Sequence, residues 1–220
     1  MKTPKLIFLT SILLVHLLLH GCVRTEKTIN QDAKNPPDMT IHEESRPIQI
    51  EPIVLELPEG HMLGRIEMGV LCIPMTDLKT IGGKAQVSEN DFTDVVRSVL
   101  ENRGYNIADN SSVTSQGYPD EEELVLRGTV KDLTANVCFP KSGFRSWKIS
   151  KGESRVKIYW QIYSKKSDKI LFETITEGCE RLSEAVGYGS SKVILGSVAV
   201  ATQNLIADKQ FSVVVTNSMN

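Results

Sequence analysis

Histidine is scarce in this chain of 220 residues, and its positions limit the chemistry that a folded domain could perform. His16 and His20 lie within the first 21 residues, and the other two histidines are His42 and His61. The sequence also lacks Gly-x-Ser-x-Gly, His-Glu-x-x-His, a Walker loop and Cys-x-x-Cys. We therefore expect a protein that is not an enzyme and that uses no cofactor and no metal ion.

Positive and negative charges are nearly balanced, and this balance argues against a nucleic-acid-binding protein. Lysine and arginine number 25 against 27 aspartate and glutamate, which leaves a formal net charge of −2. Such a mixed surface gives no electrostatic reason to bind nucleic acid. With 40% hydrophobic residues and no repeat or low-complexity tract, the composition is that of an ordinary globular domain.

The first 22 residues have the pattern of an export signal that ends at a lipid attachment site. Lys2 and Lys5 precede an apolar run over residues 6–19, which is too short for a comfortable membrane-spanning helix. The segment Leu19-His20-Gly21-Cys22 resembles the lipobox of bacterial lipoproteins, although His20 departs from its usual small or aliphatic residue. An ordinary signal peptide with a chance cysteine is the alternative.

The lipobox resemblance implies how the mature chain would be held. Cys22 would become the new amino terminus and carry diacylglycerol and further acyl chains such as palmitate, and several chains on one residue hold a protein on a membrane durably. Val23 follows where an aspartate would retain the protein in the inner membrane. In an enterobacterium-like cell the resemblance therefore implies the periplasmic face of the outer membrane.

The chain divides into three parts by composition. Residues 1–21 are the predicted signal peptide, residues 22–59 the lipidated cysteine and a flexible tether, and residues 60–220 a single periplasmic domain. The tether is predicted from its polar character and its prolines, which are Pro36, Pro37, Pro47, Pro52 and Pro58. Apolar residues alternate between positions 48 and 57, so an edge strand there is the alternative.

Hydrophobic periodicity predicts an α+β domain. A helix is expected over residues 88–103, with Ser88 as N-cap and Gly104 just past its end, and a second over residues 190–207 with Ser190 as N-cap. Strands are expected over residues 65–74, 124–138, 156–163 and 170–176, with a short one starting at Tyr105. The order β-α-β-β-β-β-α indicates a mainly antiparallel sheet with two helices packed on one face.

Three cysteines remain in the predicted domain. Cys138 and Cys179 fall at the ends of two expected strands, and an oxidising periplasm permits a disulfide between them. Cys72 lies in the middle of an expected strand, which is typical of a buried free thiol. A zinc site formed by the three cysteines and His61 is disfavoured because the spacing matches no known ligand pattern.

Aromatic residues supply the few candidates for recognition. Tyr159 and Tyr163 alternate with apolar residues and so point to the wetter face of their strand, and Trp147 lies in the preceding loop. Tryptophans more often serve as core or loop anchors, and Trp160 is expected to do so. A periplasmic module that binds a small molecule or a glycan through Trp147, Tyr159 and Tyr163 is the alternative function.

Residues 65–212 resemble a family of small periplasmic lipoproteins. The pattern Phe92-x-x-x-Val96-x-x-x-Leu100-x-x-Arg103-Gly104-Tyr105-x-Ile107, the strand from residue 124, Trp160-x-Ile162-Tyr163 and the alanine-rich last helix look like YajG-type lipoproteins. Val137-Cys138 and Thr176-x-Gly178 are also similar to a domain that precedes trypsin-like modules in some proteobacterial proteins. These motifs determine fold more than function.

The resemblance implies a role rather than a reaction. Related folds occur in lipoproteins of secretion assemblies and of the flagellar periphery. The expected function is therefore a non-enzymatic scaffold or interaction component of an envelope, secretion or flagellar assembly. Its partners would be the membrane, through the lipid, and other envelope proteins or further copies of the chain.

Overall fold

The computed structural model describes residues 45–80, 88–108, 124–141 and 148–216. Within these ranges the strands are β1 (Ile48–Ile50), β2 (Val54–Leu55), β3 (Met62–Met68), β4 (Ile73–Lys79), β5 (Ile107–Ala108), β6 (Leu124–Phe139), β7 (Ile149–Ser164) and β8 (Lys169–Gly187). The helices are α2 (Glu89–Glu101), α3 (Gly189–Ile206) and α4 (Lys209–Thr216). The α+β class is therefore confirmed, with α4 as a helix that the periodicity did not predict.

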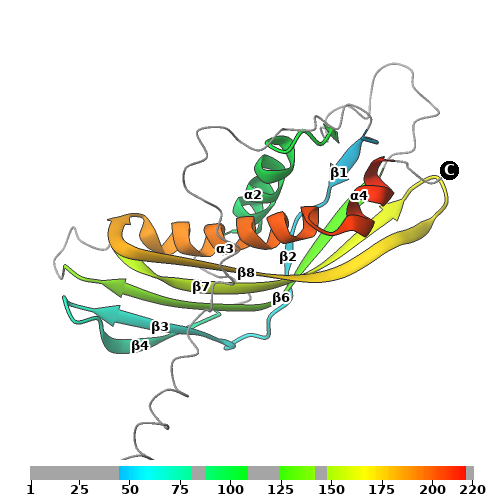
Figure 1. Ribbon diagram of the computed structural model, residues 1–220. Coiled ribbons are helices and arrows are strands. Elements are labelled where there is room, and N and C mark those ends of the chain that lie inside the picture. The colour runs from blue at the N-terminus through cyan, green and yellow to red at the C-terminus, as the bar shows by residue number, and fades with distance from the viewer. Residues whose placement is uncertain (1–44, 81–87, 109–123, 142–147, 217–220) are drawn as a thin grey trace, which may run out of the picture. The chain divides into compact units, whose positions relative to one another are not determined.

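The long strands β6, β7 and β8 form an antiparallel meander within a mixed sheet, and β8 lies at one edge (Figure 1). The second edge of β6 pairs in succession with β1, β2 and β3, and all three run parallel to it. Beyond them, β4 pairs antiparallel with β3, and β5 pairs parallel with β1. The sheet thus has more parallel pairing than the expected order implied.

The strands β1, β2 and β3, which pair parallel with β6, follow one another along the chain and are separated by two prolines. Pro52 and Pro58 lie between the strands and have no N–H to donate, so regular pairing stops at each of them. Contact with β6 nevertheless continues, because the amides of Glu51 and Glu56 donate to carbonyls of β6 at 3.0 and 3.2 Å. Breaks of this kind follow directly from the proline positions.

The segment predicted as the end of the tether belongs to the core. Ile48, Ile50 and Ile53 are at most 1% exposed, and β1 lies between β6 and β5 rather than at an edge. The predicted boundary at residue 59 is therefore wrong. The alternative of a strand in this segment is confirmed in part, because β1 and β2 are strands and β2 pairs with β6 alone, whereas β1 is not an edge strand. The prolines suggested an extended polar linker, whereas the alternating isoleucines are what pack against the sheet.

The expected strand over residues 65–74 is a hairpin instead. Its turn covers residues 69–72, where Gly69 and Cys72 have φ angles of 76° and 51°. The amide of Cys72 donates to the Gly69 carbonyl at 3.0 Å, which closes the turn. A continuous apolar run across residues 70–73 hides such a reversal from pattern analysis.

The start of α2 forms as its sequence predicts. The Ser88 hydroxyl accepts from the amide of Asp91 at 3.2 Å, and the Asp91 carboxylate accepts from the amide of Ser88 at 2.8 Å, which makes a reciprocal capping box. Gly104 has a φ of 81° just past the helix end, as expected. Helix α3 differs: it begins after Tyr188, so the prediction of Ser190 as N-cap is wrong.

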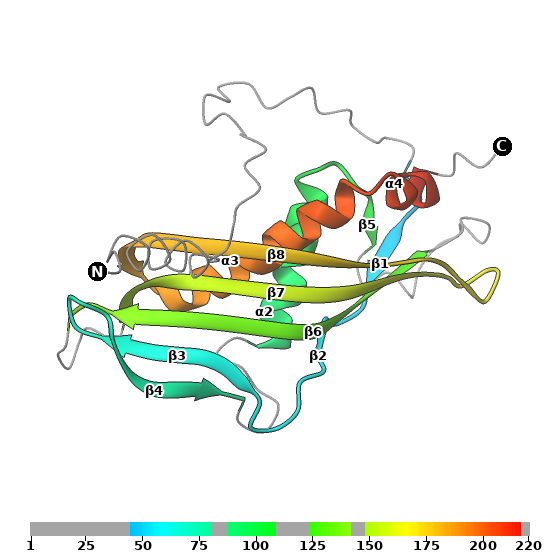
Figure 2. The ribbon, with the colours of Figure 1, turned by 60° about the horizontal axis from the view of Figure 1, so that its bottom comes forward.

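The three helices lie on one face of the sheet (Figures 1 and 2). The buried Trp160 donates to the hydroxyl of Thr176 at 2.7 Å, and Thr176 donates to the Ala201 carbonyl of α3 at 2.9 Å. Gly178 allows the close approach, because a Cβ there would lie 1.9 Å from the carbonyl oxygen of Ser197. Trp160 is therefore a core anchor, as expected.

Candidate functional site

The helix-free face of the sheet carries the two tyrosines that the sequence singled out. Along β7, buried residues alternate with Tyr159, Gln161 and Tyr163, which project from the opposite side. Tyr159 pairs across to Ile175 of β8, and Tyr163 pairs across to Ile170. These isoleucines are 58% and 50% exposed. The result is two aromatic–aliphatic pairs on the open face.

Charged groups from three segments surround these pairs. The guanidinium of Arg127 lies 5.0 Å from the ring centroid of Tyr163 and also forms two hydrogen bonds to Glu51, at 2.8 and 3.1 Å. The ammonium of Lys131 lies 5.9 Å from the ring centroid of Tyr159. We call this surface the tyrosine face and define it by the following residues: Arg127, Lys131, Tyr159, Tyr163, Ile170, Glu173 and Ile175.

Both phenols donate to carboxylates. Tyr159 donates to Glu173 at 2.6 Å, and Tyr163 donates to Asp168. These hydrogen bonds raise the pKa of Tyr159 and of Tyr163 above that of a free tyrosine, because they stabilise the protonated phenol. The tyrosine face is therefore ordered by its own hydrogen bonds and cation–π contacts at neutral pH.

Two further residues that the sequence singled out are not described by the structure. Trp147, the third candidate for recognition, and Cys22, the predicted lipidation site, both lie outside the described residues. Arg127, Lys131 and Ile175 were missed by sequence reasoning. Arg127 and Lys131 could have been found, because they alternate with buried residues on β6 as the tyrosines do on β7.

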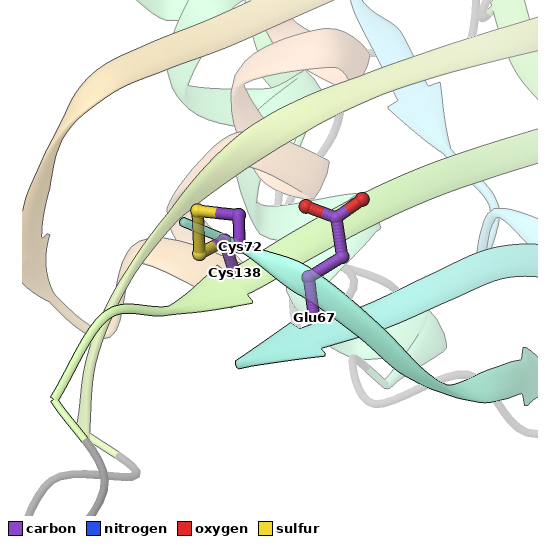
Figure 3. A group of neighbouring side chains, drawn as sticks. All are labelled: Glu67, Cys72 and Cys138. Atoms are coloured by element: carbon purple, nitrogen blue, oxygen red, sulfur yellow. A yellow bond between two sulfur atoms is a disulfide. The ribbon is translucent and has the colours of Figure 1, made fainter. Parts of the chain in front are cut away.

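A disulfide fastens the β3–β4 turn to the end of β6. Cys72 in the turn is bonded to Cys138, with their Cα atoms 5.4 Å apart, and the two residues are separated by 66 positions in sequence. The carboxylate of Glu67 lies within 4.8 Å of both sulfur atoms (Figure 3). Bonded sulfurs offer no thiolate to a metal, so this group acts as a covalent staple.

The predicted bridge between Cys138 and Cys179 is wrong. The two residues lie on β6 and β8, which are separated by β7 and hence by about 10 Å at ordinary strand spacing. Cys138 is also opposite Lys151, whereas Cys179 is opposite Arg155, four positions further along β7. A disulfide requires Cα atoms within about 7 Å. Among the cysteines that the structure describes, Cys72, predicted as the free thiol, is bonded, and Cys179 is free.

A shallow apolar hollow of about 290 Å³ lies elsewhere, between β8 and α4. Its walls come from Leu171, Phe172, Lys209, Gln210, Val213 and Val214. It does not adjoin the tyrosines, whose rings already have Arg127 and Lys131 over them. A sugar that stacked on either ring would have to compete with a cation.

No helix in the described ranges combines the length and apolar character needed to cross a membrane.

Comparisons with known proteins find similar folds but no family. No protein-family model matches the sequence, and no curated protein matches it. Among solved structures, a Xanthomonas campestris protein of the DUF330 family has 12% identity and a TM-score of 0.43, covering 79% of this chain and 86% of its own. A minor lipoprotein from Acinetobacter baumannii has 11% identity and a TM-score of 0.36, covering 79% and 94%.

A third similar structure is the PelC dodecamer from Paraburkholderia phytofirmans, with 10% identity and a TM-score of 0.37, covering 74% of this chain and 85% of its own. At these identities and TM-scores, the likenesses carry no inference about function or assembly. That inference has to come from the residues of this chain.

Proposed function

We propose that this chain is a lipid-anchored, non-enzymatic interaction protein of the bacterial envelope. It is held through Cys22 on the periplasmic face of the outer membrane, and it docks to other envelope proteins through the tyrosine face. A durable anchor raises the local concentration of the domain near membrane-bound partners, so moderate affinity is sufficient. The YajG-like resemblance of the sequence agrees with this proposal.

The observation that carries the proposal is the make-up of the tyrosine face. Two exposed aromatic–aliphatic pairs, centred on Tyr159 and Tyr163, are surrounded by charged groups. Protein interfaces have this anatomy, with an apolar centre inside a polar rim and with tyrosine and arginine enriched. The cation–π contacts and hydrogen bonds already order these side chains, which lowers the entropic cost of docking.

A photo-crosslinking amino acid placed at Ile175 tests the proposal in intact envelopes. We expect specific adducts with one or a few envelope proteins, which should be lost when Tyr159→Ala is added. The matched control places the crosslinker at Val213, an exposed residue of α4. Identical adducts from both positions would contradict docking at the tyrosine face.

The anchor is tested separately with Cys22→Ala. Metabolic labelling with a palmitate analogue should mark the parent chain and not the variant, and a high-salt wash should release the variant but not the parent from membranes. The variant should retain its thermal stability, because the described core begins only after residue 44. A label that persists in Cys22→Ala would refute lipidation at this residue.

A further inference from the structure

The turn of the β3–β4 hairpin exposes aliphatic side chains at one end of the sheet. Val70 and Leu71 at the tip are each 83% exposed, and Ile73 and Met75 on β4 are 59% and 64% exposed. Neighbouring aliphatic side chains are seldom left this open unless they meet a partner. This group, Val70, Leu71, Ile73 and Met75, is called the hairpin tip below.

The backbone beneath the hairpin tip is fixed on both sides. The amide of Gly69 donates to the carbonyl of Phe139 at 3.0 Å, and Cys72 is covalently bonded to Cys138. Both partners belong to the end of β6, which is paired along its length with β7. The exposed side chains are therefore presented from a rigid base, and little backbone entropy is lost when they become buried.

The β3–β4 turn lies at the end of the sheet where β6 ends and β7 begins (Figure 2), and basic and aromatic residues occur at that end. Lys141 follows β6, Lys148 precedes β7, and Lys151 is opposite Cys138. Tyr188 is 61% exposed, with the Lys148 ammonium 5.9 Å from its ring centroid. Tyrosine and lysine beside exposed aliphatic residues are typical of protein surfaces at the membrane–water boundary.

The composition of the hairpin tip favours lipid over protein as its partner. Binding hot spots in protein interfaces are rich in Trp, Tyr and Arg and poor in Leu and Val, whereas the tip offers only Val, Leu, Ile and Met. We propose that the hairpin tip inserts into the surface of an anionic lipid bilayer. Val70 and Leu71 enter the boundary with the acyl chains, and Lys141 and Lys148 contact lipid phosphates.

The chain is long enough for this second contact. The 16 residues of β6 separate the hairpin tip from the Ser45 end by about 50 Å. From Cys22 to Ser45 the chain can span at most about 75 Å. If Cys22 is the anchor, as proposed above, the tip can reach the bilayer that holds the lipid. The domain would then be held at two points rather than one.

Vesicle binding tests this inference without any protein partner. The mature chain carrying Cys22→Ala, and thus no lipid, is sedimented with vesicles of phosphatidylglycerol and phosphatidylethanolamine or of phosphatidylcholine alone. We expect binding to the anionic vesicles that weakens with salt. Replacing Val70 and Leu71 together by serine should weaken it about tenfold or more, while Val213→Ser, an equally simple change on α4, should not.

Two more measurements keep this inference separable from docking at the tyrosine face. Ile175→Glu should leave vesicle binding unchanged. A tryptophan introduced by Leu71→Trp should be quenched by brominated lipid, and one introduced by Val213→Trp should not. Binding that ignores the serine replacements, or an unquenched tryptophan at position 71, would overturn the proposal. Crosslinks from position 71 to a protein, in the absence of vesicle binding, would also overturn the proposal.

Discussion

The tyrosine face and the hairpin tip are both exposed, yet they differ in how their side chains are satisfied. On the tyrosine face, phenols, carboxylates and cations contact one another, so the polar groups keep their partners even without a ligand. The hairpin tip has only aliphatic side chains, and its order comes from the backbone and a disulfide. Exposure alone therefore does not identify a binding partner. The chemistry of the groups around the exposed side chains indicates which kind of partner fits.

Removing the staple should affect the hairpin tip and spare the tyrosine face. We expect Cys72→Ser with Cys138→Ser to lower the free energy of unfolding by about 4 kcal/mol, because the bridge closes a loop of 66 residues. For a domain of this size, the melting temperature should fall by about 10 °C. Circular dichroism during heating measures the effect.

The matched control is Cys179→Ser, which removes a cysteine that has no disulfide. Its melting temperature should stay close to that of the parent. Crosslinking from Ile175 should persist in the double serine variant at temperatures where it remains folded, since the tyrosine face lies on other residues. Equal melting temperatures of the double variant and the parent would show that the staple does not stabilise the domain.

Neighbouring positions on β8 test the difference between the covered and open faces of the sheet. Gly178→Ala should destabilise the domain by about 2 kcal/mol, since the new Cβ would collide with the backbone of α3 at Ser197. Cys179→Ala, one residue further and on the open face, should change stability by less than about 0.5 kcal/mol. Urea unfolding of both variants measures this. Equal losses would mean that α3 does not pack closely on β8.

The smallest expected effect concerns the phenols of the tyrosine face. Their hydrogen bonds raise the pKa of Tyr159 and Tyr163. The stability that these bonds contribute is therefore fully present below about pH 10, the range of free tyrosine, and is lost as the pH rises through the raised values. Ultraviolet absorbance of the phenolate, followed during a pH titration, should show tyrosines that ionise at a higher pH than free tyrosine, and these are called late steps below.

The assignment of that titration rests on single substitutions. Tyr159→Phe and Tyr163→Phe should each remove one late step, whereas Glu173→Gln should keep Tyr159 and bring its pKa down. If the step assigned to Tyr159 stayed late in Glu173→Gln, the carboxylate of Glu173 would not be its cause. Burial also raises the pKa of Tyr105, so the late step of Tyr105 should remain in every variant.

Local signals in the sequence predicted local structure well. Ser88 and Gly104 define the ends of α2, and the alternation around Trp160 predicts which face of β7 is buried. The helix ends and the buried face of the strand both follow from interactions between residues close in sequence. The tyrosines were likewise assigned to the open face, because a strand's two faces can be read from its own residues.

Contacts between distant segments could not be predicted in the same way. The pairing of Cys72 with Cys138 depends on the parallel register of β3 with β6, and no local pattern encodes this register. The isoleucines at positions 48 and 50 pack beside β6 despite the prolines around them. The charged rim of the tyrosine face likewise needs Arg127 and Tyr163 to be brought together by the pairing of β6 with β7.

The interrupted parallel edge of β6 has a consequence for the order of folding. β6, β7 and β8 are joined by successive reversals and can form early, because their contacts are between segments that follow one another in sequence. β1, β2 and β3 are synthesised before β6, with which all three pair, although β1 also pairs with β5 and β3 with β4. Until then, the isoleucines of the first strand stay open to other chains. We therefore expect newly made chains to depend most on chaperones during the interval before β6 becomes available.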